Sequence, residues 1–265
     1  MKILKILLLL LFGVILSYFT TKSIRNYGVV SESAHYRTDH FLITYRGAYK
    51  EEAEEIGYTL EENYDRFLNE LKDPAHSTIR IYIYSTQQDF NEGTGLINGT
   101  ANGTSCGPLE FHVLCTNWFN SIFPDDPRKT SIHEFTHCIQ LNILIKEALK
   151  KMYWEDEDKF NRAFEKKFKE EYTQWFWEAI SLYQAEGVNT VSLKYAMKDQ
   201  LSLDYLNHSN QIYNGGYTII EYIVNTWGKD KLPDLITSYV DIKEVLKVSD
   251  EDFEEGWRNF VKEKY

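Results

Sequence analysis

Three stretches in the first half of the chain show the hydrophobic pattern of short strands. HFLITY is a short stretch rich in apolar and β-branched residues, TIRIYIY alternates with its isoleucines on one face, and a further apolar stretch follows Pro108. Such alternation places one side of a strand against a core and the other side toward solvent. We therefore expect a small sheet built from residues 40–45, 78–84 and 110–116.

Most other apolar residues recur at spacings of three and four, which is the helical pattern. Residues 49–71 follow it up to Pro74, whereas residues 89–102 are rich in Gly and Asn and predict a connection. At Asp125-Asp126-Pro127, aspartates able to cap a helix precede a proline suited to its first turn. From there on we expect helices at residues 130–152, 156–172, 176–186, 213–227, 229–239 and 250–264.

These elements predict an α+β fold, in which a small mixed sheet with flanking helices is followed by a mainly helical subdomain. The 265 residues, 43% of them hydrophobic, suffice for a sizeable core. No repeat or low-complexity linker interrupts them. We therefore expect residues 31–265 to form one domain, with an α/β half at residues 31–150 and a helical half at residues 151–265.

The N-terminal residues 1–30 carry a separate signal, because Lys2 and Lys5 precede an apolar run at residues 6–19. A cleaved signal peptide needs a short apolar core, whereas a spanning helix needs about 20 apolar residues, and this run falls between the two. We expect an export segment that is either cleaved or kept as a membrane anchor, and we slightly favour the anchor. The body would then be secreted or lie on the extracellular side of the cell membrane.

The net charge of the chain bears on its partners. The formal net charge is -11 at pH 7. Binding to a nucleic-acid backbone relies on Lys and Arg side chains that displace counterions. We therefore expect no nucleic-acid partner.

The three cysteines leave alternatives open in an exported protein. Cys106 and Cys115 could close a disulfide across a hairpin that begins at Gly107-Pro108, or remain two thiols on neighbouring strands. Cys138 lies within a predicted helix, where we expect a buried, inert thiol.

SIHEFTHCIQ places two histidines four residues apart, with a glutamate directly after the first. On a helix, His133 and His137 project from one face, and Glu134 lies about 60° from His137. Both imidazoles can then bind one cation, and a catalytic zinc site uses three protein ligands with a fourth position left to water. The motif predicts a metal site with a third ligand elsewhere, although two ordinary histidines of a packed helix would show the same spacing.

A candidate for the third ligand lies in QWFWEAISLYQAE. Glu178 stands near the start of an apolar helix, directly after Trp175, Phe176 and Trp177. An unpaired carboxylate is costly to bury in such a setting, and a metal would satisfy it. The alternative is a glutamate favoured by the dipole at the start of the helix.

HEFTH followed by WEAISLY resembles the zinc-binding core of the gluzincins, the metallopeptidases of the thermolysin and aminopeptidase N type. IYNGGYTIIEYIVNTWG resembles the part of aminopeptidase N-like enzymes in which a tyrosine, followed three residues later by a glycine, opens a long apolar helix. SDEDFEEGWRNFV is similar to the last helix of that catalytic domain. The resemblance extends from about Glu110 to the C-terminus, and it implies a minimal zincin-like domain with the active-site cleft between its two halves.

The resemblance implies a role for each matching residue. His133, His137 and Glu178 would bind Zn²⁺, which would polarise a water molecule and the scissile carbonyl. Glu134 would accept a proton from that water and pass it to the leaving amine. The substrate would be a peptide or a protein.

Two tyrosines compete for a further role. Tyr213 matches the family's tyrosine and Gly216 its glycine, so Tyr213 would stabilise the oxyanion. Tyr217, one turn further along, is its rival, and either could instead be an aromatic residue of the substrate groove. His112, on the strand before the motif, could also line the cleft, although an ordinary strand histidine is the reading that we favour.

The chain also departs from the family pattern. The segment between His137 and Glu178 is longer than in aminopeptidase N-like enzymes. Its charged run at residues 146–171 could be a lid, although we favour a solvated helical hairpin. There is no clear counterpart of the Gly-x-Met-Glu-Asn strand that holds the substrate's free amine, so endo- and exopeptidase activity both stay open.

We therefore expect an exported or membrane-anchored zinc metallopeptidase. One alternative is a non-catalytic surface binding module that retains the gluzincin fold, although such a module has no need of Glu134 beside three intact ligands. The other is a zinc hydrolase that acts on a non-peptide amide, because water activation does not itself select the acyl group.

Overall fold

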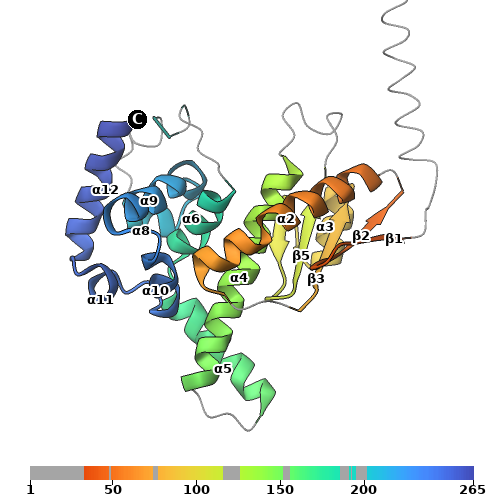
Figure 1. Cartoon of the computed structure of the whole chain (residues 1–265), viewed down its shortest axis with the longest axis horizontal. Coiled ribbons are helices and arrows are strands. Elements are labelled where there is room, and N and C mark those ends of the chain that lie inside the picture. Colours follow the sequence, from red (N-terminus) through yellow and green to blue (C-terminus); the bar gives the residue numbers. More distant parts are fainter. Residues whose placement is uncertain are drawn as a thin grey trace, which may run out of the picture.

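The computed structural model describes residues 33–47, 49–73, 77–115, 126–151, 156–185, 191, 193–194 and 202–265. A sheet with its flanking helices forms one side of the molecule and a group of helices forms the other (Figure 1). Helix α4 (Pro127–Lys151) runs between the two. This arrangement confirms the predicted α+β class, with a mixed sheet followed by a mainly helical part.

Five strands form one sheet in the order β1-β2-β3-β5-β4. The three central strands are parallel, and each edge strand is antiparallel to its neighbour. Ile43 lies opposite Ile81, and Ile81 opposite Phe111, so apolar residues of neighbouring strands share one face. The strands are Ser33–Arg37 (β1), Phe41–Arg46 (β2), Ile79–Tyr84 (β3), Gly103–Ser105 (β4) and Glu110–Leu114 (β5).

Helices α2 (Lys50–Leu71) and α4 cover the apolar face of the sheet. Phe135 of α4 joins the layers, because its ring packs edge-on against Phe41 of β2 at 5.2 Å and stacks on Tyr64 of α2 at 5.9 Å. Burying such a side chain contributes about 2 to 3 kcal/mol. Helix α3 (Gln87–Thr94) lies against the other face, where Phe90 packs edge-on against Tyr84.

The helical half is organised around the contact between α6 (Gln174–Gln184) and α9 (Ile212–Trp227). Gly216 allows this close approach, because a Cβ atom there would lie 3.0 Å from Leu182 Cδ1 and 3.2 Å from the Cα atom of Ala179. The remaining helices are α5 (Glu157–Glu171), α8 (Leu203–Asn207), α10 (Lys231–Thr237), α11 (Ile242–Leu246) and α12 (Asp250–Lys264).

The expected connection at residues 89–102 is wrong in its first part, because α3 begins at Gln87 and ends at Thr94. The Thr86 hydroxyl caps this helix by accepting a hydrogen bond from the Asp89 amide at 3.1 Å. Strands β1 and β4 were not expected either. With three residues, β4 is too short to show an apolar period, and it exists because it pairs with β5.

None of the three cysteines forms a disulfide. Cys106 lies opposite Glu110 across the β4–β5 hairpin, with its amide donating to the Glu110 carbonyl at 2.8 Å. Cys115 follows the other end of β5, and because it lies five positions after Glu110, its side chain projects from the opposite face. Cys115 and Cys138 are buried, and Cys106 is exposed.

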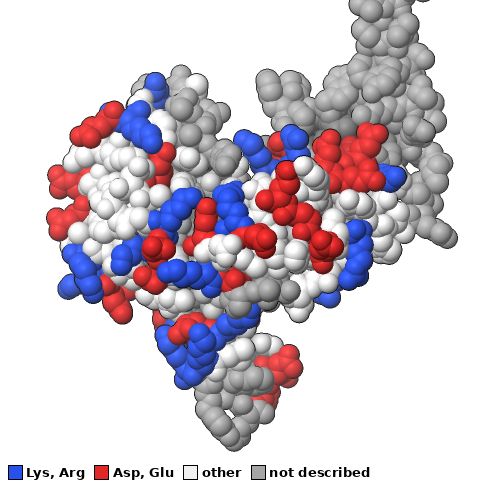
Figure 2. Space-filling model, in the orientation of Figure 1, with Lys and Arg blue, Asp and Glu red and all other residues white. Residues whose placement is uncertain are grey.

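The charged side chains are mixed over the face drawn in Figure 2, where acidic groups gather over the start of α2. Within the described residues, no helix is long and apolar enough to span a membrane. The export segment expected at residues 1–30 lies outside the described residues.

Candidate metal centre

Three side chains from two helices converge on one point. His133 and His137 lie one turn apart on α4, and their Nε2 atoms are 3.0 Å apart. Glu178 comes from the first turns of α6, and its Oε2 lies 3.1 Å from His133 Nε2 and 3.8 Å from His137 Nε2. The structure thus brings together the two motif histidines and the glutamate predicted as the third ligand.

This cluster could hold a metal ion. Its three ligand atoms all lie within 4.8 Å of one another. In a tetrahedral zinc site with bonds of about 2.0 to 2.1 Å, neighbouring ligand atoms are about 3.3 Å apart. The observed separations of 3.0 to 3.8 Å bracket that value. Two imidazoles and a carboxylate are also a donor set that divalent transition metals accept.

A hydrogen-bond chain behind His137 leaves its Nε2 atom free for a cation. His137 Nδ1 lies 3.0 Å from Ser181 Oγ, and the Ser181 hydroxyl donates to the Trp177 carbonyl at 3.3 Å. Because the Ser181 hydroxyl donates its proton to that carbonyl, its oxygen accepts a hydrogen bond from the Nδ1–H group of His137. Such an outer hydrogen bond fixes the tautomer of a metal-binding histidine.

Aromatic packing holds the same imidazole in place. Trp177 stacks on His137 with ring centroids 4.0 Å apart and planes 8° apart. Gln140 donates to the Trp177 carbonyl at 3.1 Å and accepts from the Tyr172 hydroxyl at 2.9 Å. Sequence reasoning did not single out Ser181, Gln140 or Trp177 as supports. The spacing could have revealed Ser181 and Gln140, because Ser181 follows Glu178 by three residues and Gln140 follows His137 by three, which places each on the same helix face as its ligand.

Glu134 is buried between α4 and the edge strand β4. Its carboxylate accepts a hydrogen bond from the Ser105 backbone amide. The strand approaches so closely that a Cβ atom on Gly103 would lie 2.5 Å from Glu134 Oε1 and 2.7 Å from Thr130 Cγ2. A side chain at position 103 would therefore have to displace the strand or the side chains of Glu134 and Thr130. The contribution of β4 was missed because the strand has no apolar pattern.

The charges of the site shift the pKa values of the two histidines in opposite directions. Burial opposes protonation of His133, but the hydrogen bond with Glu178 and the nearby carboxylates outweigh it and raise the pKa. Burial lowers the pKa of His137 well below its usual range, and the charge of His133 adds to that effect. A neutral His137 is the form that binds a metal.

Burial raises the pKa of Glu134 to about 7. The negative charge of Glu178 adds to this rise, whereas His133 and the Ser105 amide oppose it. A carboxyl group with this pKa can both accept and release a proton near neutral pH, as a general base requires.

The structure brings Tyr213 to the ligand set, at the start of α9. Its ring centroid lies 6.5 Å from that of His133, and its hydroxyl shares a hydrogen bond with Glu178. Although Tyr213 is 51% exposed, partial burial and the charges of Glu178 and Glu134 raise its pKa, so the phenol keeps its proton. Tyr217 packs instead against Tyr183, with ring centroids 5.3 Å apart.

His112 does not join these residues. It is buried on β5, where its neighbours Phe111 and Val113 face the core. Its ring projects from the other face of the sheet and stacks on Tyr82 and Tyr84.

A cavity of about 530 Å³ reaches the ligand set from the helical half. Glu178 and Trp177 line it together with residues of α5, including Phe168, and with His208 beyond α8. The predicted helical hairpin at residues 146–171 is formed by the end of α4 and by α5 (Figure 1), although residues 152–155 lie outside the described residues. Phe168 packs edge-on against Trp177, so α5 borders the site.

Comparison of the chain with known protein families and with curated proteins gives no match.

Proposed function

We propose that this chain is a zinc-dependent metallopeptidase of the gluzincin type. One observation carries the proposal: the ligand atoms of His133, His137 and Glu178 meet, and the buried carboxylate of Glu134, with a pKa of about 7, interacts with them. A site that only bound a metal would need the three ligands and would not need a buried base beside them.

Zinc is the ion that this donor set favours. Imidazole and carboxylate ligands in a three-residue site are typical of catalytic zinc, with the fourth position left to water. When bound, zinc would supply Lewis-acid polarisation of a water molecule and of the scissile carbonyl.

The chain's own residues would move the protons. Glu134 would take a proton from the attacking water and deliver it to the leaving amine. Tyr213 keeps its phenolic proton and would donate it in a hydrogen bond to the developing oxyanion, a contribution of about 3 to 4 kcal/mol for a well-placed donor. Peptide would enter along the cleft between the α/β half and the helical half, as in a zincin-like fold.

The N-terminal segment supports the proposal that the enzyme acts outside the cytoplasm. Lys2 and Lys5 followed by an apolar run are typical of export. The enzyme would be secreted or would stay on the extracellular side of the cell membrane through an uncleaved anchor.

The test uses the full-length chain, purified without chelators and supplied with zinc. Zinc content is measured by elemental analysis, and cleavage of a mixed peptide library is followed by mass spectrometry. We expect Glu178→Ala to lose one zinc per chain relative to the parent. Glu134→Gln is expected to keep zinc and lose about 100- to 10,000-fold in rate.

Glu147→Gln provides the matched control. This residue lies on the same helix as Glu134, but its carboxylate pairs with Lys150 and Lys151. The exchange should change neither zinc content nor rate. Equal zinc in the parent and in Glu178→Ala would refute the site.

The same experiment separates the alternatives. Zinc binding without cleavage of any peptide or amide would favour the surface binding module. Cleavage restricted to non-peptide amides would keep the site and replace the substrate class. The positions of the cut bonds would separate endo- from exopeptidase activity.

A further inference from the structure

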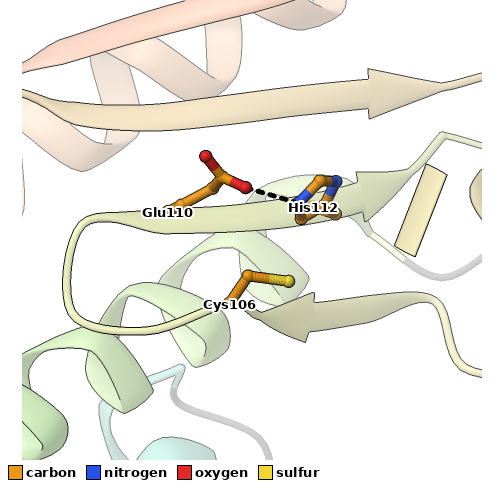
Figure 3. Close-up of side chains that lie close together, drawn as sticks. All are labelled: Cys106, Glu110 and His112. Carbon is orange, nitrogen blue, oxygen red and sulfur yellow. Dashed lines mark hydrogen bonds and ion pairs between the residues drawn. The ribbon is translucent and has the colours of Figure 1, made fainter. Parts of the chain in front are cut away.

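A second cluster of metal-binding side chains lies on the β4–β5 hairpin. The ligand atoms of Cys106, Glu110 and His112 all lie within 4.8 Å of one another. Figure 3 shows the three side chains grouped at the hairpin, two from β5 and one from just beyond β4.

Strand pairing explains why these residues meet. Cys106 lies opposite Glu110, since its amide donates to the Glu110 carbonyl at 2.8 Å, and Glu110 and His112 are two residues apart on one strand. Side chains opposite each other, and those two apart, share one face of a sheet. That face is the one turned away from the core, because Phe111 and Val113 occupy the other. The cluster is therefore separate from the His133 site.

The His112 ring is already oriented for a metal. Its Nδ1 lies 3.0 Å from the Tyr84 hydroxyl, and its Nε2 lies 3.2 Å from Glu110 Oε1. The ring is held at 5% exposure against Tyr82 and Tyr84. When Nδ1 donates its proton to Tyr84, the lone pair of Nε2 faces the other two ligands, which is the tautomer that metal binding uses.

The other two ligands complete a site with an entry path. Arg80 Nε donates to Glu110 Oε2 at 2.9 Å, which orients the carboxylate and leaves Oε1 toward His112. The exposed Cys106 thiol opens the cluster to solvent. A ligand oriented by a hydrogen-bond partner and a path open to solvent are the features expected of a site that can take up a metal ion.

We propose that Cys106, Glu110 and His112 bind a divalent transition metal of the zinc class. Thiolate and imidazole ligands select such ions, whereas Ca²⁺ and Mg²⁺ require oxygen ligands. On binding, Cys106 releases its thiol proton to solvent, and the fourth position of the metal stays open to water. The site goes beyond the proposed peptidase activity and does not depend on it.

Co²⁺ is the probe for this site, titrated into the reduced full-length chain. A thiolate bound to Co²⁺ gives a charge-transfer absorption in the near ultraviolet, and imidazole and carboxylate ligands do not give it. We expect this band in the parent and in Glu178→Ala, and no band in Cys106→Ala. Cys138→Ala, which removes a buried thiol of α4, serves as the matched control and should keep the band.

The outcome is independent of the peptidase proposal. A band that is retained in Glu178→Ala assigns the metal to the hairpin whatever happens at the His133 site. A parent without the band, or a band that persists in Cys106→Ala, overturns the proposal. Tyr84→Phe supplies a second measurement: losing the partner of His112 Nδ1 should weaken Co²⁺ binding by about 10- to 100-fold.

Discussion

Ser181 shows what a residue outside the ligand set contributes. Its hydroxyl lies 3.0 Å from His137 Nδ1 and fixes the imidazole for ligation. We expect Ser181→Ala to weaken zinc binding at this site by about 10- to 100-fold, measured by competition with a chromophoric chelator. Ser238→Ala, which removes a hydroxyl that donates to a backbone carbonyl of α10, should leave the affinity unchanged. Equal affinities in the two variants would contradict this role.

The buried carboxyl of Glu134 makes the stability of the metal-free protein depend on pH. Its folded-state pKa of about 7 exceeds the ordinary value of 4.5, so the folded chain retains a proton that the unfolded chain releases between those values. The free energy of unfolding, taken relative to that of Glu134→Gln, is therefore highest below about pH 4.5. It should fall by up to about 3 kcal/mol as the pH rises to about 7.

Urea unfolding in the presence of a chelator, repeated at several pH values, measures this difference. Subtracting the variant removes the titration of groups that both chains share. A difference in the free energy of unfolding that stays flat across the window would contradict the raised pKa of the buried Glu134 carboxyl.

At the scale of elements, the edge strand β4 depends on a glycine. A Cβ atom on Gly103 would lie 2.5 Å from Glu134 Oε1, so Gly103→Ala must displace either the strand or the carboxylate. We expect the rate of peptide cleavage to fall at least about tenfold while zinc content is retained, because the ligands lie on α4 and α6. An unchanged rate would show that β4 has no part in placing the base.

The packing of α6 against α9 depends on a second glycine. Gly216→Ala would place a Cβ atom 3.2 Å from the backbone of Ala179, which cannot rotate away as a side chain can. We expect a loss of about 1 to 3 kcal/mol in the free energy of unfolding, read from the urea midpoint. Asn225→Ala, at an exposed position of the same helix, controls for helix propensity and should change stability by less than about 0.5 kcal/mol.

At the scale of the whole molecule, the three proposed metal ligands come from both parts of the fold. Two come from α4, which packs on the sheet, and one comes from α6, which packs on α9. An ion that binds only the folded chain stabilises it by about 4 kcal/mol when free zinc is 1,000 times the dissociation constant. Removal of zinc by a chelator should therefore lower the thermal midpoint.

The measurement is made in Cys106→Ala, so that only the site formed by α4 and α6 contributes. A chain that carries both Cys106→Ala and Glu178→Ala is the control and should melt at the same temperature with and without the chelator. An equal shift in both chains would place the stabilising ion elsewhere.

Long periodic segments were predictable because their pattern spans several turns or alternations. Residues 49–71 correspond to α2, and the stretches at residues 40–45 and 78–84 correspond to β2 and β3. Helices α3, α8 and α11 and strands β1 and β4 were missed, since a short element contains too few residues to show a period. Two of these elements, α3 and β4, form against partners that the fold brings close: Phe90 of α3 packs on Tyr84, and β4 pairs with β5.

The sequence by itself determined that His133 and His137 share one helix face, because spacing along a helix is set by local hydrogen bonds. It also made Glu178 a candidate, through the cost of burying a carboxylate among aromatic residues. Only the tertiary structure decided that Glu178 meets the histidines, that Tyr213 approaches them while Tyr217 packs on Tyr183, and that Gly103 lies against Glu134. Each of these contacts joins elements far apart in the chain, and their distances depend on how whole helices and strands pack.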